Sequence, residues 1–152
     1  MPRTYDQHGI RFLYPDNWLV TDEQSLEPPY SVGLQTPQGG MWVLQIHEQG
    51  EPLELASEAL KTMRAEYAEL EADSITERIE EHDVLGFEMR FYYLDFVVMA
   101  RVLSLRVRDR TLVLLCQAED RDYESLAPVF QAMLVSILRS GKTSPPLRTT
   151  DF

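Results

Sequence analysis

The segment from Tyr123 to Ser140 constrains the fold more than any other part of the chain, because its apolar residues recur at helical spacing. These residues lie within one arc of a helix and are Tyr123, Leu126, Ala127, Phe130, Met133, Leu134, Ile137 and Leu138. A helix with a single apolar face must bury that face against another element. We expect regular helix from near Ser125, which leaves Pro128 in the first turn, to a stop at Gly141.

A second amphipathic helix is predicted to begin at Pro52, a residue that suits the first helical turn because its missing N–H costs nothing there. The apolar positions share a spacing of three or four residues and are Leu53, Ala56, Leu60, Met63, Tyr67 and Leu70. Acidic and basic residues such as Glu58 and Lys61 fall on the opposite side.

The remaining segments show the period-two alternation of half-buried strands. They are residues 10–14, 18–20, 31–37, 41–48, 75–82, 87–93, 97–107 and 111–119. Turns are expected at Pro37 to Gly40, at Asp83 to Gly86 and at Arg108 to Arg110, where glycine or polar residues interrupt the pattern. Residues 21–31 contain Pro28-Pro29 and are predicted to form a surface loop.

Hairpins interrupted by one amphipathic helix and closed by another predict an α+β fold, with an antiparallel β-sheet flanked by helices. A chain of 152 residues is long enough for one domain with a substantial core. We therefore expect a single domain over residues 1–140. Residues 141–152 include Pro145-Pro146, lack periodicity and are predicted to form a flexible C-terminal tail.

Three segments also carry a resemblance to a known fold group: Gly9-Ile10-Arg11-Phe12-Leu13-Tyr14-Pro15-Asp16-Asn17-Trp18, the turn entering Gly86-Phe87-Glu88, and Phe130 to Ile137 with Ser136. They resemble the superfamily shared by PsbP, the extrinsic photosystem II subunit, and the Ran-binding nuclear import factor. Many small bacterial domains of unknown function are similar to it. The resemblance implies an α/β/α sandwich whose members bind, assemble or chaperone rather than catalyse, and one bacterial branch escorts apolar segments of secreted toxins. It implies no functional residue in this chain.

The charge of the chain narrows the class of partner. The formal net charge is -11, which repels phosphate and excludes nucleic acid as the expected ligand. A basic or apolar protein partner is easier to accommodate. Acidic residues are dense between Glu66 and Asp83, and Glu77, Glu80 and Glu81 are candidate partner-binding residues there, although such runs are most often solvated faces.

An aromatic run suggests a second surface. Alternation places Phe91 and Tyr93 on one face of a strand and Tyr92 on the other, so Phe91 and Tyr93 are candidate residues of an apolar groove. Such a groove would suit a chaperone that shelters an apolar segment of a secreted client. The competing interpretation is a core face with one exposed tyrosine.

Catalytic motifs are absent from the sequence. It contains no phosphate-binding glycine loop, nucleophile elbow or metal-ligand motif, so neither enzymatic activity nor a cofactor or metal site is expected. The histidines leave one alternative open, a small-ligand binder or enzyme that uses His47 with Glu48 and Glu51, or His82 with the acids beside it. Solvated surface is the more common role of such residues.

The single cysteine, Cys116, lies in an apolar run and can form no disulfide within the chain, which suits a reducing compartment. No apolar stretch reaches the length of a signal peptide or a membrane span. We therefore expect a cytoplasmic, non-enzymatic protein-interaction or assembly domain without membrane insertion. It would act through its acidic surface or its sheet face, and its oligomeric state stays open.

Overall fold

The structure is a computed structural model that describes residues 1–22 and 26–143, with side chains up to residue 140. The strands of these residues are β1 (Arg3–Gln7), β2 (Ile10–Tyr14), β3 (Leu19–Asp22), β4 (Tyr30–Gln35), β5 (Met41–His47), β6 (Glu71–Ile79), β7 (His82–Tyr93), β8 (Phe96–Val107) and β9 (Arg110–Glu119). The helices are α1 (Pro52–Glu66) and α2 (Asp120–Thr143). Residues 23–25 of the predicted loop and 144–152 of the predicted tail lie outside the described residues.

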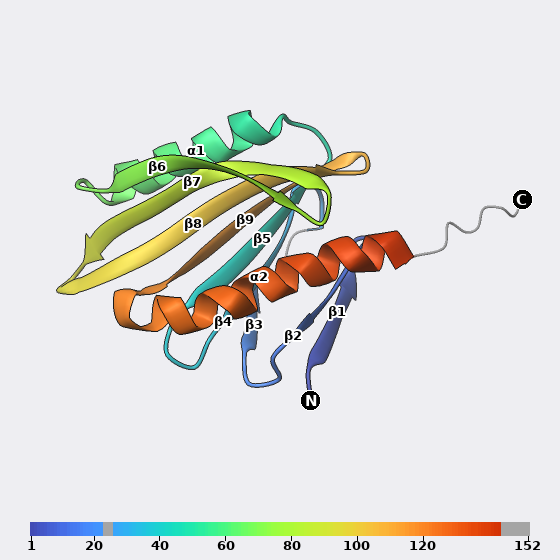
Figure 1. The fold of residues 1–152 in the computed structure, drawn as a ribbon, viewed down its shortest axis with the longest axis horizontal. Helices are drawn as coiled ribbons and strands as arrows, with labels where there is room; N and C mark the ends of the chain where they lie inside the picture. The colour runs from blue at the N-terminus through green and yellow to red at the C-terminus, as the bar shows by residue number, and fades with distance from the viewer. Residues whose placement is uncertain (23–25, 144–152) are drawn as a thin grey trace, which may run out of the picture.

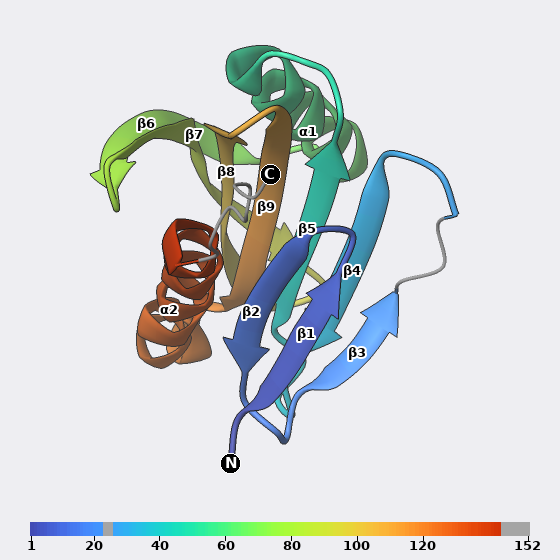
Figure 2. The same cartoon turned by 90° about the vertical axis from the view of Figure 1, so that its right-hand side faces the viewer.

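Seven strands form one antiparallel sheet in the order β3-β4-β5-β9-β8-β7-β6, and β1 and β2 form a separate hairpin. Helix α1 lies along one face of the sheet (Figure 1). Helix α2 and the β1–β2 hairpin lie on the other face (Figure 2). The predicted α+β architecture, an antiparallel sheet flanked by helices, is confirmed.

The central strand β9 shows why the sheet needs cover on both sides. Leu112 and Leu114 are buried in the core beneath α2, whereas Val113 between them is buried in the core beneath α1. Successive strand residues point to opposite faces, so a strand that is apolar at every position must be covered twice.

Two of the predicted hairpins are confirmed. Strands β4 and β5 are joined by a turn in which Gly39 adopts a φ of +95° and the backbone N–H of Gly40 donates to the Thr36 hydroxyl at 2.8 Å. Strands β8 and β9 reverse at Arg108 and Asp109. Trp18, which follows the turn at Pro15, is buried.

The turn predicted at Asp83 to Gly86 is wrong. The chain reverses earlier, at Glu80 and Glu81, which both adopt positive φ, and Gly86 lies inside β7. A Cβ atom on Gly86 would come within 1.8 Å of the Val102 carbonyl oxygen. This glycine therefore permits close contact between two strands, a requirement that is easily mistaken for a turn in the sequence.

The predicted start of α1 at Pro52 is confirmed, but its predicted end and both predicted boundaries of α2 are wrong. Helix α2 begins at Asp120 rather than near Ser125, continues through Gly141, and contains Pro128 in its interior. Acidic residues in its first turn favour the earlier start through the helix dipole, and burial of the apolar stripe outweighs the proline cost of about 3 kcal/mol. Helix α1 ends at Glu66, and Leu53 is 58% exposed.

Strand β1 was not predicted, because only Tyr5 of its five residues is buried. With one apolar residue the segment has no readable period, and it becomes a strand through its pairing with β2. The hairpin is held against α2 by the backbone N–H of Leu13, which donates to the Ser136 hydroxyl at 3.0 Å.

Candidate interaction groove

A large groove lies between α2 and the sheet. Helix α2 packs on β2, β8 and β9, while β6 and β7 curve out beyond it, so the sheet is concave on this side (Figure 2). The groove has a volume of about 1280 Å³. We call it the α2 groove, and its floor and helical wall include Met99, Arg101, Leu103, Tyr123, Ala127 and Gln131.

The wall formed by α2 is fixed to the sheet by both apolar and polar contacts. Phe130 is 3% exposed and its ring lies edge-on to Trp18 with centroids 5.8 Å apart. The indole N–H of the fully buried Trp42 donates to the Phe130 carbonyl oxygen at 3.3 Å. The wall is therefore anchored through the core, and the groove is a preformed feature of the fold.

Arg101 is the main polar group on the floor of the groove. It lies on β8, its side chain is only 19% exposed, and its Nη2 atom is 2.5 Å from Oε2 of Glu77 on β6. Its Nε atom is 3.5 Å from Oε2 of Glu88 on β7. Burial opposes the charge of Arg101, but the hydrogen bond and negative charge of Glu77 outweigh it and raise the pKa. The guanidinium stays charged and ties three strands together.

Carboxylates surround one end of the groove. Asp73 on β6 lies directly opposite Glu88 in the strand ladder, so both project to the face that bears Arg101. Asp120 and Glu124 line the groove from the first turns of α2. Arg90 shares this face with Arg101, but the carboxylates of Asp73, Glu77, Glu88, Asp120 and Glu124 outnumber the two guanidinium groups, so this end is negative.

The other end of the groove is close to neutral. Arg139 of α2 contacts the carboxylate of Glu80 with its Nε and Nη2 atoms at 3.2 and 3.3 Å. Arg11 of β2 lies 3.8 Å from Asp6. Opposite charges cancel within each of these two pairs. The negative potential along the groove is therefore strongest at the end near Asp73 and Asp120.

Neither the cysteine nor the tyrosine of the groove is ionised at neutral pH. Burial raises the pKa of the Cys116 thiol, and burial likewise raises the pKa of the Tyr123 hydroxyl. A protonated, buried thiol is a weak nucleophile, so Cys116 acts as an apolar part of the floor.

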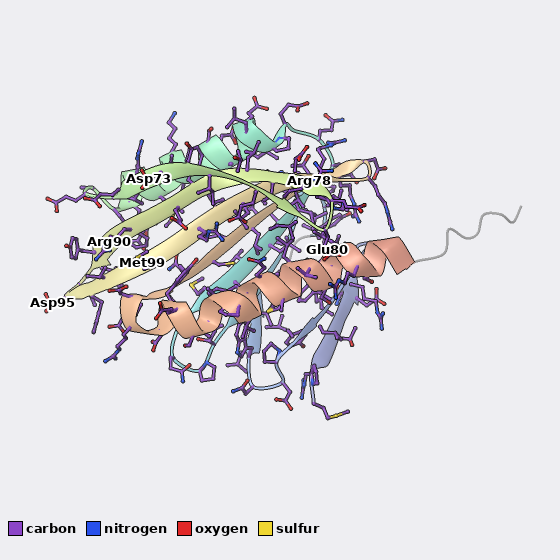
Figure 3. The ribbon with its side chains drawn as sticks, viewed as in Figure 1. Asp73, Arg78, Glu80, Arg90, Asp95 and Met99 are labelled. Atoms are coloured by element: carbon purple, nitrogen blue, oxygen red, sulfur yellow. The ribbon has the colours of Figure 1, made fainter. Side chains whose placement is uncertain are left out.

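The structure separates the predicted partner-binding residues. Glu77 lies on β6 beside the α2 groove and pairs with Arg101 of its floor, whereas Glu80 and Glu81 form the β6–β7 turn at the far end of β6 (Figure 3). The acidic run is thus divided between a groove and a turn, because an extended strand separates residues only a few positions apart by roughly 10 Å.

The groove predicted around Phe91 is closed. Phe91 is 1% exposed, and the ring of Tyr67 stacks on it with centroids 4.1 Å apart, beneath α1. Tyr93 is 54% exposed at the end of β7, where it meets Tyr67 edge-on. The chain leaves α1 at Tyr67 and lays that ring over Phe91, a contact that strand alternation does not reveal.

The histidines do not converge on one site. His47 lines a small pocket of about 290 Å³ between β5 and α1, with its Nε2 atom 3.1 Å from Oε1 of Gln45. Burial lowers its pKa, an effect that the negative charge of Glu58 opposes. The acid near His47 is therefore Glu58 rather than the predicted Glu48 or Glu51. His82 lies elsewhere, with Nδ1 2.9 Å from the Glu80 carbonyl oxygen.

No cluster of three His, Cys, Asp or Glu side chains suited to a metal ion occurs among residues 1–22 and 26–140. Neither helix in the described part of the chain is long and apolar enough to cross a bilayer.

The periodicity and charge of the sequence do not indicate the α2 groove or the role of Arg101. One signal is present, since Arg101 is a charged residue within the otherwise apolar run from Val97 to Leu103. A charge in such a run needs a partner when it is buried. The identity of that partner, Glu77, depends on two strand pairings.

No protein-family model matches the sequence, and no curated protein matches it either. Solved structures do match. Cyanobacterial PsbP (CyanoP) from Synechocystis is 15% identical with a TM-score of 0.65, over 89% of this chain and 90% of that one. The Saccharomyces cerevisiae Ran-binding protein Mog1p is 11% identical with a TM-score of 0.56, over 91% and 93%.

A protein of unknown function from Pseudomonas aeruginosa, PA94, is 12% identical with a TM-score of 0.50, over 89% of this chain and 94% of that one. These identities are low, so the likeness concerns the fold. The order of elements, the antiparallel sheet and the near-complete coverage of each chain together show that this protein has the PsbP-like fold.

Proposed function

We propose that this protein is a non-enzymatic protein-interaction domain that binds, in the α2 groove, a segment of another protein with an apolar face and lysine or arginine side chains. The observation that carries the proposal is the groove itself, an anchored concavity of about 1280 Å³ with a largely apolar floor, the acidic residues Asp120 and Glu124 in its lining, and Asp73 and Glu88 on the adjoining strands.

The size of the groove favours a macromolecular ligand. Pockets for small molecules commonly measure roughly 300–1,000 Å³ and enclose most of the ligand. The α2 groove exceeds that range and is open along α2. Between Tyr123 and Arg139 the helical wall is about 24 Å long at the usual rise per residue. A partner helix of about four turns would match this length.

The charge of the groove favours a basic segment. Asp73, Glu88, Asp120 and Glu124 surround the end where Arg101 is already held by Glu77. Complementary charge on a partner would speed association and select against acidic competitors. The same fold occurs in Mog1p, which is a Ran-binding protein, and this supports protein binding as a use of the fold.

A pair of synthetic peptides tests the proposal. Each has about 16 residues, with leucine and alanine on one face and either lysine or glutamate on the other. Fluorescence anisotropy should show binding of the lysine peptide that weakens as NaCl is raised, and weaker or no binding of the glutamate peptide.

Two tryptophan variants locate the site. Ala127→Trp places an indole in the groove from α2 and should abolish binding of the lysine peptide. Ala65→Trp introduces the same side chain at an exposed position of α1 and should bind as wild type does. The proposal fails if the two peptides bind equally or if Ala127→Trp retains full affinity.

Two alternative functions are compatible with this structure, and the same experiments distinguish them. A chaperone for an apolar client segment would use the same groove, and it would bind an uncharged alanine–leucine peptide as tightly as the lysine peptide. A small-ligand site at His47 would occupy the pocket of about 290 Å³ and would be lost in His47→Ala without any effect on peptide binding.

We further propose that the protein acts in the cytoplasm. Its single cysteine is buried and forms no disulfide within the chain, which suits a reducing compartment. Cell fractionation of the full-length protein tests this, and recovery from a secreted or membrane fraction would contradict it.

A further inference from the structure

The turn between β7 and β8 carries an exposed cluster of large apolar residues. Tyr92 is 61% exposed, Tyr93 54%, Leu94 76% and Phe96 47%, and all four lie within five consecutive positions. We call residues 92–96, including Asp95, the aromatic tip. It projects from one end of the sheet, where Asp95 is labelled in Figure 3. A compact exposed apolar cluster of this kind marks an interaction surface.

The backbone of the aromatic tip is strained as well. Leu94 adopts a φ of +58°, a left-handed conformation that glycine and asparagine enter far more easily than leucine. An exposed turn gains nothing in stability from a leucine at such a position. The tip therefore combines backbone strain with exposed apolar area, and neither property helps the domain to fold.

The aromatic tip adjoins the face that forms the α2 groove through one residue, Tyr92. Arg90 lies opposite Met99, which lines the groove, and Tyr92 lies opposite Val97 one step further toward the tip. Residues two apart in a strand share a face, so Tyr92 belongs to the face that forms the groove. Tyr93 and Phe96 pair with each other on the opposite face, where Tyr93 meets Tyr67. Figure 3 shows Arg90 and Met99 on β7 and β8, near the end of the sheet that carries Asp95.

Asp95 favours a protein partner over a lipid bilayer as the ligand of the aromatic tip. A tip that inserts into lipid would carry this carboxylate into or against the hydrocarbon, which is costly. A protein partner can instead place a lysine or arginine against Asp95 while Tyr92 and Leu94 enter an apolar contact. This matches the basic, apolar chemistry already favoured by the walls of the groove.

We propose that the aromatic tip is a second anchor for the same partner. It binds the residues that adjoin the groove-bound segment, which would be apolar and would include a lysine or arginine next to Asp95. This inference rests on the proposed function, since it extends the surface that the α2 groove begins.

Lengthened peptides test the inference. The lysine peptide is extended by about six residues of leucine, tryptophan and lysine at its N-terminus in one version and at its C-terminus in another. One of the two extensions should bind about tenfold more tightly than the parent peptide. Absence of any gain from either extension overturns the second anchor.

The variant Leu94→Asn separates binding from folding. Asparagine suits positive φ, so its unfolding temperature should equal or exceed that of wild type. The variant should retain wild-type affinity for the parent peptide and lose the tenfold gain from the extension. Leu19→Asn, an exposed leucine on the edge strand β3, is the matched control and should keep that gain.

The remaining outcomes are distinguishable. If the parent lysine peptide fails to bind, the proposed function fails and the second anchor fails with it. If the parent binds and Leu94→Asn keeps the extension's gain, only the second anchor fails. Sedimentation of wild type, but not of Leu94→Asn, with phosphatidylcholine vesicles would overturn the protein partner of the tip in favour of lipid.

Discussion

At the scale of single residues, Arg101 shows how a buried charge organises a surface. Its guanidinium sits between carboxylates of β6 and β7, so it neutralises Glu77 while leaving the more exposed Glu88 available to solvent or a partner. Removing Glu77 leaves the Arg101 charge in a mostly buried site, whereas removing Arg101 leaves Glu77 able to contact water. The two substitutions should therefore differ in their effect on the free energy of unfolding.

We expect Glu77→Gln to destabilise the protein by about 1–2 kcal/mol, because Arg101 would keep its charge in a mostly buried site with a weaker acceptor. Arg101→Met should stay within about 1 kcal/mol of wild type, since Glu77 can hydrate and methionine fills the space. Urea unfolding measures both. Equal losses in the two variants would contradict this view of the pair.

The same Arg101→Met variant should bind the lysine peptide more tightly, by about fivefold or about 1 kcal/mol, because Glu77 and Glu88 lose their internal counter-charge. Fluorescence anisotropy at low NaCl tests this. A weaker affinity would indicate that Arg101 itself contacts the partner.

Gly86 is a second residue whose role depends on close packing. In Gly86→Ala the added methyl would meet the Val102 carbonyl oxygen, which belongs to the backbone of β8 and cannot rotate away. We expect a loss of about 3 kcal/mol in the free energy of unfolding. Thr76→Ala, at an exposed position of the neighbouring strand β6, is the control and should change stability little. Comparable stability of both variants would argue against the close approach.

His47 should make stability depend on pH. Burial lowers its pKa in the folded protein below the value near 6.5 expected in the unfolded chain. The unfolded state then binds more protons than the folded state in the window below about pH 6.5, so this contribution is present above that pH and is lost as the pH falls. Chemical unfolding at several pH values should show a flatter profile for His47→Gln than for wild type. Parallel profiles would contradict the shift.

At the scale of elements, α2 contains an interior residue that destabilises a helix. Pro128 lies in the third turn and removes a backbone donor, yet the helix runs unbroken from Asp120 to Thr143. The apolar stripe around Phe130 and Leu134 is almost completely buried, and this burial holds the helix together across the proline. Helix propensity is thus overruled by packing.

We expect Pro128→Ala to raise the free energy of unfolding by about 1–3 kcal/mol, because an exposed interior proline is replaced by the best helix former. Thermal unfolding followed by circular dichroism measures the change. A destabilised variant would mean that the proline shapes a bend on which α2 packing depends.

The elements also show where prediction from sequence succeeds. Strands β8 and β9 and the apolar stripe of α2 were found because each has many residues with one period. The start of α1 at Pro52 is found as well, but strand β1, the C-terminal end of α1 and both ends of α2 are not, because Tyr5 alone carries no period and Gly141 does not stop a helix whose stripe is already buried. Local preference decided the centres of elements and tertiary contacts decided their ends.

At the scale of the whole molecule, negative charge is the dominant property. A net charge of -11 on a compact domain produces self-repulsion that opposes folding. We expect the unfolding temperature to rise as NaCl is increased from low to moderate concentration, over the range in which charges become screened. Calorimetry tests this. A temperature that falls with salt would show that attractive ion pairs such as Arg101–Glu77 outweigh the repulsion.

The sequence by itself determined the fold class, which is an antiparallel α+β fold with two amphipathic helices. It also determined the acidic surface and the absence of catalytic motifs. These follow from periodicity and charge, which are local and additive along the chain. Only the tertiary structure decided which acidic residues lie beside an exposed apolar surface. The α2 groove exists because β6 and β7 curve away from α2, and Phe91 is closed off because Tyr67 stacks on it. Both depend on contacts between residues distant in sequence, which no local pattern specifies.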